Sequence, residues 1–184
     1  MTELSLNVLD IANNSIRAGA GLIEIIVQIQ RDLDSLMITI VDDGCGMTEE
    51  QLKRVEDPFF TTRTTRSIGL GVPFFKMAAL STGGSFHITS APGSGTTVTA
   101  VFGLTHIDRM PLGDMNSTIH TLITLNTHID FLYTFVFDGE QFTLDTRVFR
   151  QILNDVPLDS PEVSSYIKEY LIENQNETDG GYHV

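Results

Sequence analysis

The stretch Val41-Asp42-Asp43-Gly44-Cys45-Gly46-Met47 follows a run of apolar and β-branched residues that begins at Ser35. The run predicts a strand over 35–42 that ends in a carboxylate, and the two glycines after it allow a sharp turn and a close approach of backbone to a ligand. An ionised Asp42 is a hydrogen-bond acceptor only, which suits an exocyclic amine such as that of adenine. The same pattern is also typical of an ordinary strand-end turn, so other stretches must decide between the two interpretations.

The bulk composition excludes several classes of protein. The chain has 184 residues, 41% of them hydrophobic, and a net charge of −13, which disfavours nucleic acid and anionic membranes as partners. A single cysteine excludes an internal disulfide and fits a reducing compartment. No apolar run is long enough for a membrane span, and the N-terminus lacks the features of a signal peptide. We therefore expect a cytoplasmic location.

Hydrophobic periodicity predicts alternating helices and strands over the first 103 residues. The first helix carries Asp10, Asn14 and Arg17 at i, i+4 and i+7, so the three polar side chains share one face. This face is either the solvated side of an amphipathic helix or a set of groups suited to Mg²⁺ and phosphate. The expected helices are 3–18, 48–55 and 70–81, and the expected strands are 22–30, 35–42, 85–90 and 96–102.

A segment without regular period, residues 57–67, separates two of these helices and is rich in hydroxyl groups. It contains Arg63 and Arg66 and leads into Ile68-Gly69-Leu70-Gly71 at the start of a helix. A glycine turn that opens a helix is a natural phosphate site, because free N–H groups and the helix dipole point at the ligand. A polar loop with solvated arginines is the alternative interpretation.

Taken in order, these stretches resemble the motifs of the GHKL superfamily, the ATP-binding domains of gyrase B, mismatch-repair ATPases, histidine kinases and anti-sigma-factor kinases. The resemblance covers residues 3–103 and implies a Bergerat-type fold, an α/β two-layer sandwich with helices on one face of a mixed sheet. The matching blocks are Leu9–Ala20 for the N box, Asp42–Met47 for the G1 box, Asp57–Thr62 for the F box, Gly69–Val72 for the G2 box and Gly93–Thr96 for the closing turn.

The resemblance also implies roles for single residues, with ATP and Mg²⁺ as the cofactors. Asn14 would hold Mg²⁺, Asp42 would bind the adenine amine, and Thr96 would support that contact. Residues 57–68 would form a lid over the nucleotide. The remaining implied contacts are the glycine-turn residues Gly44, Gly46, Gly69, Leu70 and Gly71, which bring backbone to base and phosphates, and the basic phosphate contacts Arg17, Arg63 and Arg66.

Two positions depart from the family pattern. Asp10 stands where hydrolytic and serine-kinase members have Glu and histidine kinases have Asn, so it keeps the charge with one methylene less. Ile68 stands where many members have a small residue. An acid at position 10 supplies a base within the domain, which favours attack by water or a protein hydroxyl over transfer to histidine. We expect no phosphoacceptor histidine segment in this chain.

The remaining residues carry no recognisable motif. We expect a linker over 104–113, a small α+β domain over 114–174 that packs on the first domain or binds a protein partner, and a flexible tail over 175–184. Its expected elements are a helix capped by Asp114, a strand over 129–137 that turns at Asp138-Gly139, a helix over 146–154 and a last helix that begins at Ser160-Pro161.

The sequence therefore predicts a Mg²⁺- and ATP-binding regulatory protein that hydrolyses ATP or phosphorylates a protein Ser or Thr, with Asp10 as the catalytic base. One alternative is a subunit of a larger complex that senses nucleotide without turnover. The chain resembles proteins encoded near hydrogenase or NADH-oxidising subunits, which suggests that such a complex has a redox link. The other is a detached histidine-kinase catalytic domain. The expected partners are ATP or ADP and a protein contacted by residues 114–174, with a homodimer as a further option.

Overall fold

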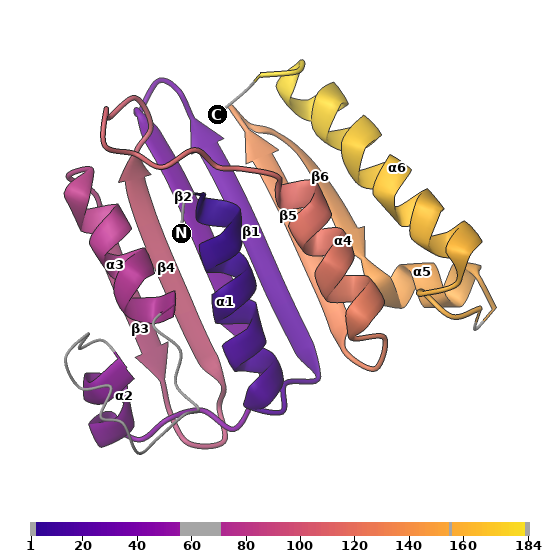
Figure 1. Ribbon diagram of the computed structural model, residues 1–184, viewed down its shortest axis with the longest axis horizontal. Coiled ribbons are helices and arrows are strands. Elements are labelled where there is room, and N and C mark those ends of the chain that lie inside the picture. Colours follow the sequence, from indigo (N-terminus) through magenta and orange to yellow (C-terminus); the bar gives the residue numbers. More distant parts are fainter. Residues whose placement is uncertain (1–2, 56–70, 155, 183–184) are drawn as a thin grey trace.

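The structure is a computed structural model that describes residues 3–55, 71–154 and 156–182. A single mixed sheet forms one layer, and helices cover one of its faces (Figure 1). The strand order is β3-β4-β2-β1-β5-β6, in which β1 and β5 are parallel and every other pair is antiparallel. The strands are β1 (Leu22–Gln30), β2 (Ser35–Asp42), β3 (Ser85–Ser90), β4 (Thr96–Gly103), β5 (Asp130–Phe137) and β6 (Glu140–Asp145).

The helices follow the expected positions closely, and two of their N-termini carry the predicted caps. The Asp114 side chain accepts the backbone N–H of Ser117 at 2.8 Å. Thr48 and Gln51 cap the second helix reciprocally, each side chain accepting the backbone N–H of the other. The helices are α1 (Leu4–Arg17), α2 (Glu49–Val55), α3 (Gly71–Ser81), α4 (Met115–Leu125), α5 (Thr146–Ile152) and α6 (Pro161–Asp179).

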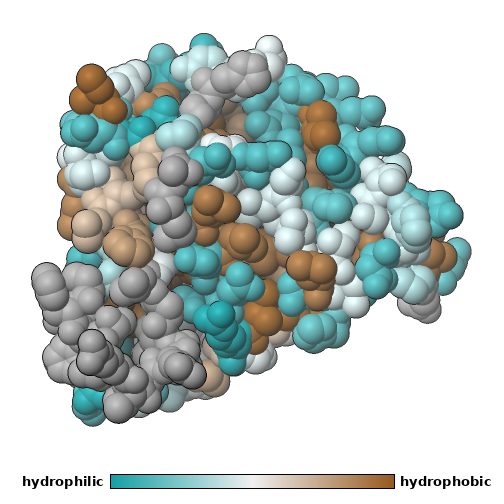
Figure 2. Space-filling model, viewed as in Figure 1, coloured by the Kyte–Doolittle hydropathy of each residue, from teal (hydrophilic) through white to brown (hydrophobic). Residues whose placement is uncertain are grey.

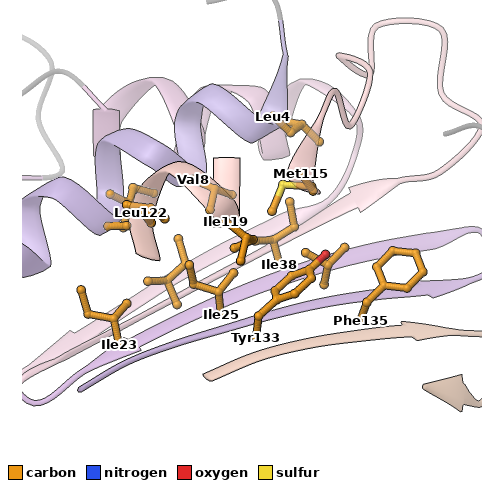
Figure 3. Close-up of a cluster of buried hydrophobic side chains, with 14 of the residues drawn as sticks. Leu4, Val8, Ile23, Ile25, Ile38, Met115, Ile119, Leu122, Tyr133 and Phe135 are labelled. Atoms are coloured by element: carbon orange, nitrogen blue, oxygen red, sulfur yellow. The ribbon is translucent and has the colours of Figure 1, made fainter. Parts of the chain in front are cut away.

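The core lies between the sheet and the helices. Every second residue of β1 and β2 is buried, as a strand with one covered face requires. Val8 of α1 and Ile119 and Leu122 of α4 point toward Ile25 and Tyr133 on the strands below them (Figure 3). Burial of this continuous apolar layer supplies most of the free energy that holds the helices on the sheet.

The C-terminal strands differ from the separate unit that the sequence suggested. β5 pairs with β1 from Leu22 opposite Asp130 to Ile29 opposite Phe137, so the expected 114–174 domain continues the sheet of the first 103 residues. Residues 104–113 connect strands of one sheet rather than two independent sheets. This arrangement satisfies the backbone of β1 on both sides and buries its alternate side chains under α1 and α4.

The expected flexible tail is wrong over its first part. α6 continues past Asn174 to Asp179 and ends at Gly180, whose φ of 64° is the left-handed conformation typical of a helix C-terminus. Asp179 is buried, and its Oδ1 accepts the backbone N–H of Gly181 at 2.8 Å. Within residues 3–55, 71–154 and 156–182, no helix is long and apolar enough to cross a bilayer.

Candidate functional site

A cavity of about 300 Å³ opens where α1 meets the ends of β2 and β4. Its polar groups include Asn14, Ser15 and Arg17 of α1 and Gln51 of α2. The two strand ends add Asp42 and Thr96. Its walls are apolar and include Ile11, Ile40, Val72, Ile88 and Val98. A mostly apolar cavity with a few convergent polar groups is the usual form of a small-molecule site.

Asp42 lies at the buried end of this cavity and is 8% exposed. Its Oδ2 accepts the hydroxyl of Ser15 at 2.5 Å, and its Oδ1 accepts the backbone N–H of Gly44 at 2.9 Å. Thr96 is its direct partner across the β2–β4 ladder. The strand register thus places the two residues expected at an adenine amine side by side.

The neighbouring Asp43 has a different task. It faces outward, and its Oδ1 accepts the backbone N–H groups of Gly21 and Leu22 at 2.7 and 2.9 Å. These bonds tie the turn between α1 and β1 to the end of β2. Only one carboxylate of the Asp42-Asp43 pair is therefore available to a ligand in the cavity.

Two glycines fix how the loop after β2 lies against the turn between β3 and β4. Gly46 has a φ of 66°, and a Cβ on it would lie 1.9 Å from the carbonyl oxygen of Ala91. A Cβ on Gly95 would lie 1.8 Å from the carbonyl oxygen of Asp42. At these glycines the two loops approach each other backbone to backbone, and Thr96 beside them lines the cavity.

The outer end of the cavity is polar. Arg17 and Asn14 line it one turn apart on α1, and a guanidinium nitrogen of Arg17 donates to Oδ1 of Asn14 at 3.4 Å. Asp10, one turn earlier on α1, is exposed. Gly71 begins α3 so close to it that a Cβ there would lie 2.8 Å from the Cβ of Asp10. The acid thus lies against the backbone of Gly71, the first described residue of α3.

The structure brings most of the expected residues together. Asn14, Arg17, Asp42, Gly46 and Thr96 line the cavity, and Gly44 donates to Asp42 at its edge. Asp10 and Gly71 touch each other at α1 and α3, although Asp10 does not line the described cavity. The expected contacts Arg63, Arg66, Gly69 and Leu70, and the lid over 57–68, lie outside the described residues.

Sequence reasoning missed the hydroxyl groups that hold the acceptors in place. Ser15 lies in the buried stripe of α1 and donates to Asp42, and Ser90 at the end of β3 contacts Thr96 at 3.0 Å. The signal for Ser15 was present in the sequence, because a hydroxyl in an otherwise apolar helix stripe needs a buried partner. No comparable signal singled out Ser90.

Comparisons with known proteins agree with this geometry. The family model for histidine kinase-, DNA gyrase B- and HSP90-like ATPases matches residues 2–106. Sporulation kinase B of Bacillus subtilis is 33% identical over 101 residues, which cover 53% of this chain and 23% of that kinase. The sensor protein kinase FleS of Pseudomonas aeruginosa is 36% identical over 97 residues, which cover 53% of this chain and 24% of that kinase.

A solved structure, the N-terminal domain of a DNA repair protein, has a similar fold. It superposes with a TM-score of 0.56 at 18% identity and covers 79% of this chain and 53% of that one. The fold similarity thus extends over a larger share of the chain than the family model does. The matched part is about a quarter of the length of the two kinases.

Proposed function

The chain belongs to the family of histidine kinase-, DNA gyrase B- and HSP90-like ATPases, and on this basis we propose that the cavity binds Mg²⁺-ATP and that Asp10 promotes transfer of its terminal phosphoryl group. The acceptor is water or a protein Ser or Thr hydroxyl. The observation that carries the proposal is the placement of Asp10 against Gly71 at the start of α3, one turn of α1 from Asn14. Asp10 and Asn14 lie one turn apart on α1, so a carboxylate and an amide oxygen would both stand near the phosphates of a bound nucleotide.

The buried end of the cavity would take the adenine ring. Asp42 retains acceptor capacity beyond the bonds from Ser15 and Gly44, because an ionised carboxylate has about four lone-pair sites. Ile40 and Val98 line the cavity beside it and supply apolar contact for the faces of the ring. An amine bonded to Asp42 in this setting would gain a charge-assisted hydrogen bond away from water.

The outer end would take the phosphates. The weakly engaged Oδ1 of Asn14 is an oxygen donor of the kind that Mg²⁺ accepts, and Arg17 is a cation at the same rim. In the described part of the chain, no group of three His, Cys, Asp or Glu side chains could hold a metal without further ligands. Phosphate oxygens and water would therefore complete the coordination of Mg²⁺. Bound there, the ion would offset negative charge on the phosphates.

In this proposal Asp10 acts on the attacking group. It is exposed, and its carboxylate forms no ion pair with another described residue. Its carboxylate would accept the proton from the attacking oxygen, or orient that oxygen in line with the terminal phosphorus. The N–H groups at the start of α3, with Arg63, Arg66, Gly69 and Leu70 from the preceding segment, would contact the phosphates.

Phosphate release from Mg²⁺-ATP by the purified chain, measured beside the Asp10→Asn variant, tests this role. Asp10→Asn keeps the size of the side chain and is expected to lower the turnover rate at least 100-fold while ADP affinity stays near that of the wild type. Asn14→Ala, the matched change one turn later, is expected to weaken nucleotide binding only when Mg²⁺ is present. Wild-type turnover in Asp10→Asn would contradict the proposal.

A nucleotide sensor without turnover is the second candidate function. Asp10 is one methylene shorter than Glu. β5, from residues 114–174, also belongs to the same sheet as β2, whose end lines the cavity, so bound nucleotide could act on that part of the chain through the sheet. ADP binding without phosphate release or protein phosphorylation would favour this function. Because the two relatives are named kinases, labelling of a histidine on a separate protein is the third outcome to look for.

We also propose that residues 114–174 contact a protein partner. Apolar side chains interrupt the polar surface of the helix-bearing face (Figure 2), and Val148, Ile152 and Tyr166 are 47%, 71% and 53% exposed. Phe149 contacts Tyr166 and Tyr170 through ring centroids 5.9 and 5.4 Å apart. A contiguous apolar patch formed by such groups would suit a protein partner. Sedimentation at increasing protein concentration tests whether the partner is a second copy.

A further inference from the structure

Ser90 lies behind Thr96, outside the cavity, and its hydroxyl meets three groups. It lies 2.8 Å from the backbone nitrogen of Met47, 2.8 Å from the carbonyl oxygen of Gly95 and 3.0 Å from Oγ1 of Thr96. These contacts join the loop after β2, the turn between β3 and β4, and the wall of the cavity. A hydroxyl has one hydrogen and two lone pairs, so Ser90 is fully engaged.

The direction of each hydrogen bond follows from what the partners can do. The Gly95 carbonyl can only accept, so it takes the single hydrogen of Ser90. The backbone N–H of Met47 can only donate, so it uses one lone pair of Ser90. The Thr96 hydroxyl can do either, and with the Ser90 hydrogen committed to Gly95 it must donate. The Thr96 hydrogen therefore points at Ser90.

This assignment decides what Thr96 offers to a ligand. With its hydrogen directed at Ser90, the Thr96 hydroxyl can offer only its lone pairs to a ligand in the cavity that Thr96 lines. Asp42, its partner across the ladder, presents a carboxylate to the same cavity. The strand-end side of the cavity is thus built from two acceptors, which match a donor on the ligand and repel another acceptor.

We propose that Ser90 is a positioning residue that holds the Thr96 hydroxyl as an acceptor. Ser90 thereby sets a preference for purines with an amino group at position 6 over purines with an oxygen at that position. The proposal rests on the proposed nucleotide function of the cavity. A 6-oxo purine would place its oxygen opposite lone pairs of Thr96 and Asp42. A site whose polar groups are fixed in this way rejects the mismatched ligand, because those groups lose their partners.

Titration of ADP and of IDP into the protein tests the inference, with the ratio of the two dissociation constants as the readout. Ser90→Ala frees the Thr96 hydroxyl to turn and donate to the oxygen of hypoxanthine. We expect the preference for ADP to fall roughly tenfold, the equivalent of about one hydrogen bond. Ser90→Thr, the matched control, keeps the hydroxyl and should keep the preference. The two bases also differ at ring nitrogen N1, but this difference is the same for every variant and so does not affect the comparison of the ratios.

A double-mutant cycle separates this role from a merely structural one. Thr96→Val keeps the shape of the side chain without the hydroxyl, so it should lower the preference by itself, and adding Ser90→Ala should then change the ratio no further. Ser90→Cys replaces the oxygen with a weak acceptor of similar shape, and it should lower the preference even if Ser90→Ala folds poorly.

The outcomes distinguish failure of the inference from failure of the proposed function. Absence of ADP binding by the wild type would overturn both. ADP binding with the same ratio in wild type, Ser90→Ala and Ser90→Cys would overturn the role of Ser90 alone. An equal loss of ADP and IDP affinity in these variants would assign Ser90 to the support of the two loops, and would equally overturn its role in base preference.

Discussion

The consecutive residues Asp42 and Asp43 show that position, rather than residue type, decides which side chain can meet a ligand. The pleat of β2 turns Asp42 into the covered face, where Ser15 and the Gly44 N–H hold it at the end of the cavity. Asp43 points the other way and fixes the turn at Gly21. Exchange of the two roles would need a shift of one residue in strand register.

Gly46 and Gly93 give a matched test of loop packing at the residue scale. Their φ values are 66° and 74°, but a Cβ on Gly46 would meet the Ala91 carbonyl oxygen at 1.9 Å, whereas Gly93 has nothing within 4 Å. Gly93→Ala should lower the free energy of unfolding by about 1–2 kcal/mol through backbone strain alone. Gly46→Ala should lower it by roughly 3 kcal/mol or more, because two loops must separate.

Chemical denaturation of the two variants measures this difference, and ADP titration shows its consequence. We expect weaker ADP binding in Gly46→Ala and little change in Gly93→Ala, which lies on the solvent side of the turn. Equal unfolding free energies for the two variants would show that the close approach of the loops contributes nothing.

Some of the candidate site residues could be singled out from local patterns, before the family resemblance implied their roles. Helical spacing puts Asn14 and Arg17 on one face of α1, and Asp42 stands at a strand end before two glycines. Ser90 could not be found in this way, because its importance depends on the pairing of β3 with β4 opposite Thr96. Long-range register of this kind leaves no mark in a local pattern.

At the scale of elements, an ion pair joins the end of β1 to the turn between β5 and β6. The backbone N–H of Arg31 donates to Asp138 at 2.8 Å, and its guanidinium donates at 2.5 Å. These bonds lower the pKa of Asp138, the backbone bond most strongly. Arg31 also lies over the ring of Phe137, with 4.9 Å to the centroid.

This ion pair predicts sensitivity to acid. Because the folded-state pKa of Asp138 lies below its unfolded value, its contribution to stability is present above about pH 4 and is lost as the pH falls through the folded pKa. Asp138→Asn should lower the free energy of unfolding at pH 7 and flatten its decline in acid. The residue has a φ of 47°, which Asn tolerates, so the change removes charge without new strain.

Urea unfolding of wild type and Asp138→Asn at pH 7 and near pH 3.5 measures the effect. The difference between the two proteins should shrink at the lower pH and at high salt. If the difference in unfolding free energy depended on neither pH nor salt, the contribution of Asp138 would come from the shape of the turn rather than from its charge.

Caps and turns were predictable at this scale, because each depends on a few adjacent residues. Asp114, the reciprocal Thr48 and Gln51 pair, and the tight turn at Asp138-Gly139 all lie where the sequence placed them. The end of α6 was not predictable, because Asn174–Asp179 is polar and its helix depends on contacts made by Leu171 and Asp179 with the rest of the fold.

At the scale of the whole molecule, residues 3–103 and 114–182 share one sheet and one layer of helices. The parallel pairing of β1 with β5 and the contacts of α1 with α4 cross the expected boundary at 104–113. The sequence could not show this, because strand order depends on pairing between residues about a hundred positions apart. A unit with its own periodic strands and helices looks the same from sequence whether it stands alone or extends a sheet.

The distribution of tyrosines allows a direct test of this unity. The four tyrosines are Tyr133, Tyr166, Tyr170 and Tyr182, all in the C-terminal part, whereas helices and strands contribute to circular dichroism throughout. Denaturant curves followed by tyrosine fluorescence and by far-ultraviolet circular dichroism should therefore coincide. Loss of the tyrosine signal at clearly lower denaturant would show that the C-terminal strands unfold as a separate unit.

The central claim is that the cavity at the ends of β2 and β4 binds adenine nucleotide through Asp42. Calorimetric titration of ADP with Mg²⁺ into the wild type and into Asp42→Asn tests this claim most directly. We predict binding by the wild type and a loss of at least about tenfold in Asp42→Asn, because the variant exchanges an acceptor pair for a side chain with one acceptor and one donor group. Its unfolding midpoint should show that the chain remains folded. Equal ADP affinity in the two proteins, or no binding by the wild type, would contradict the claim.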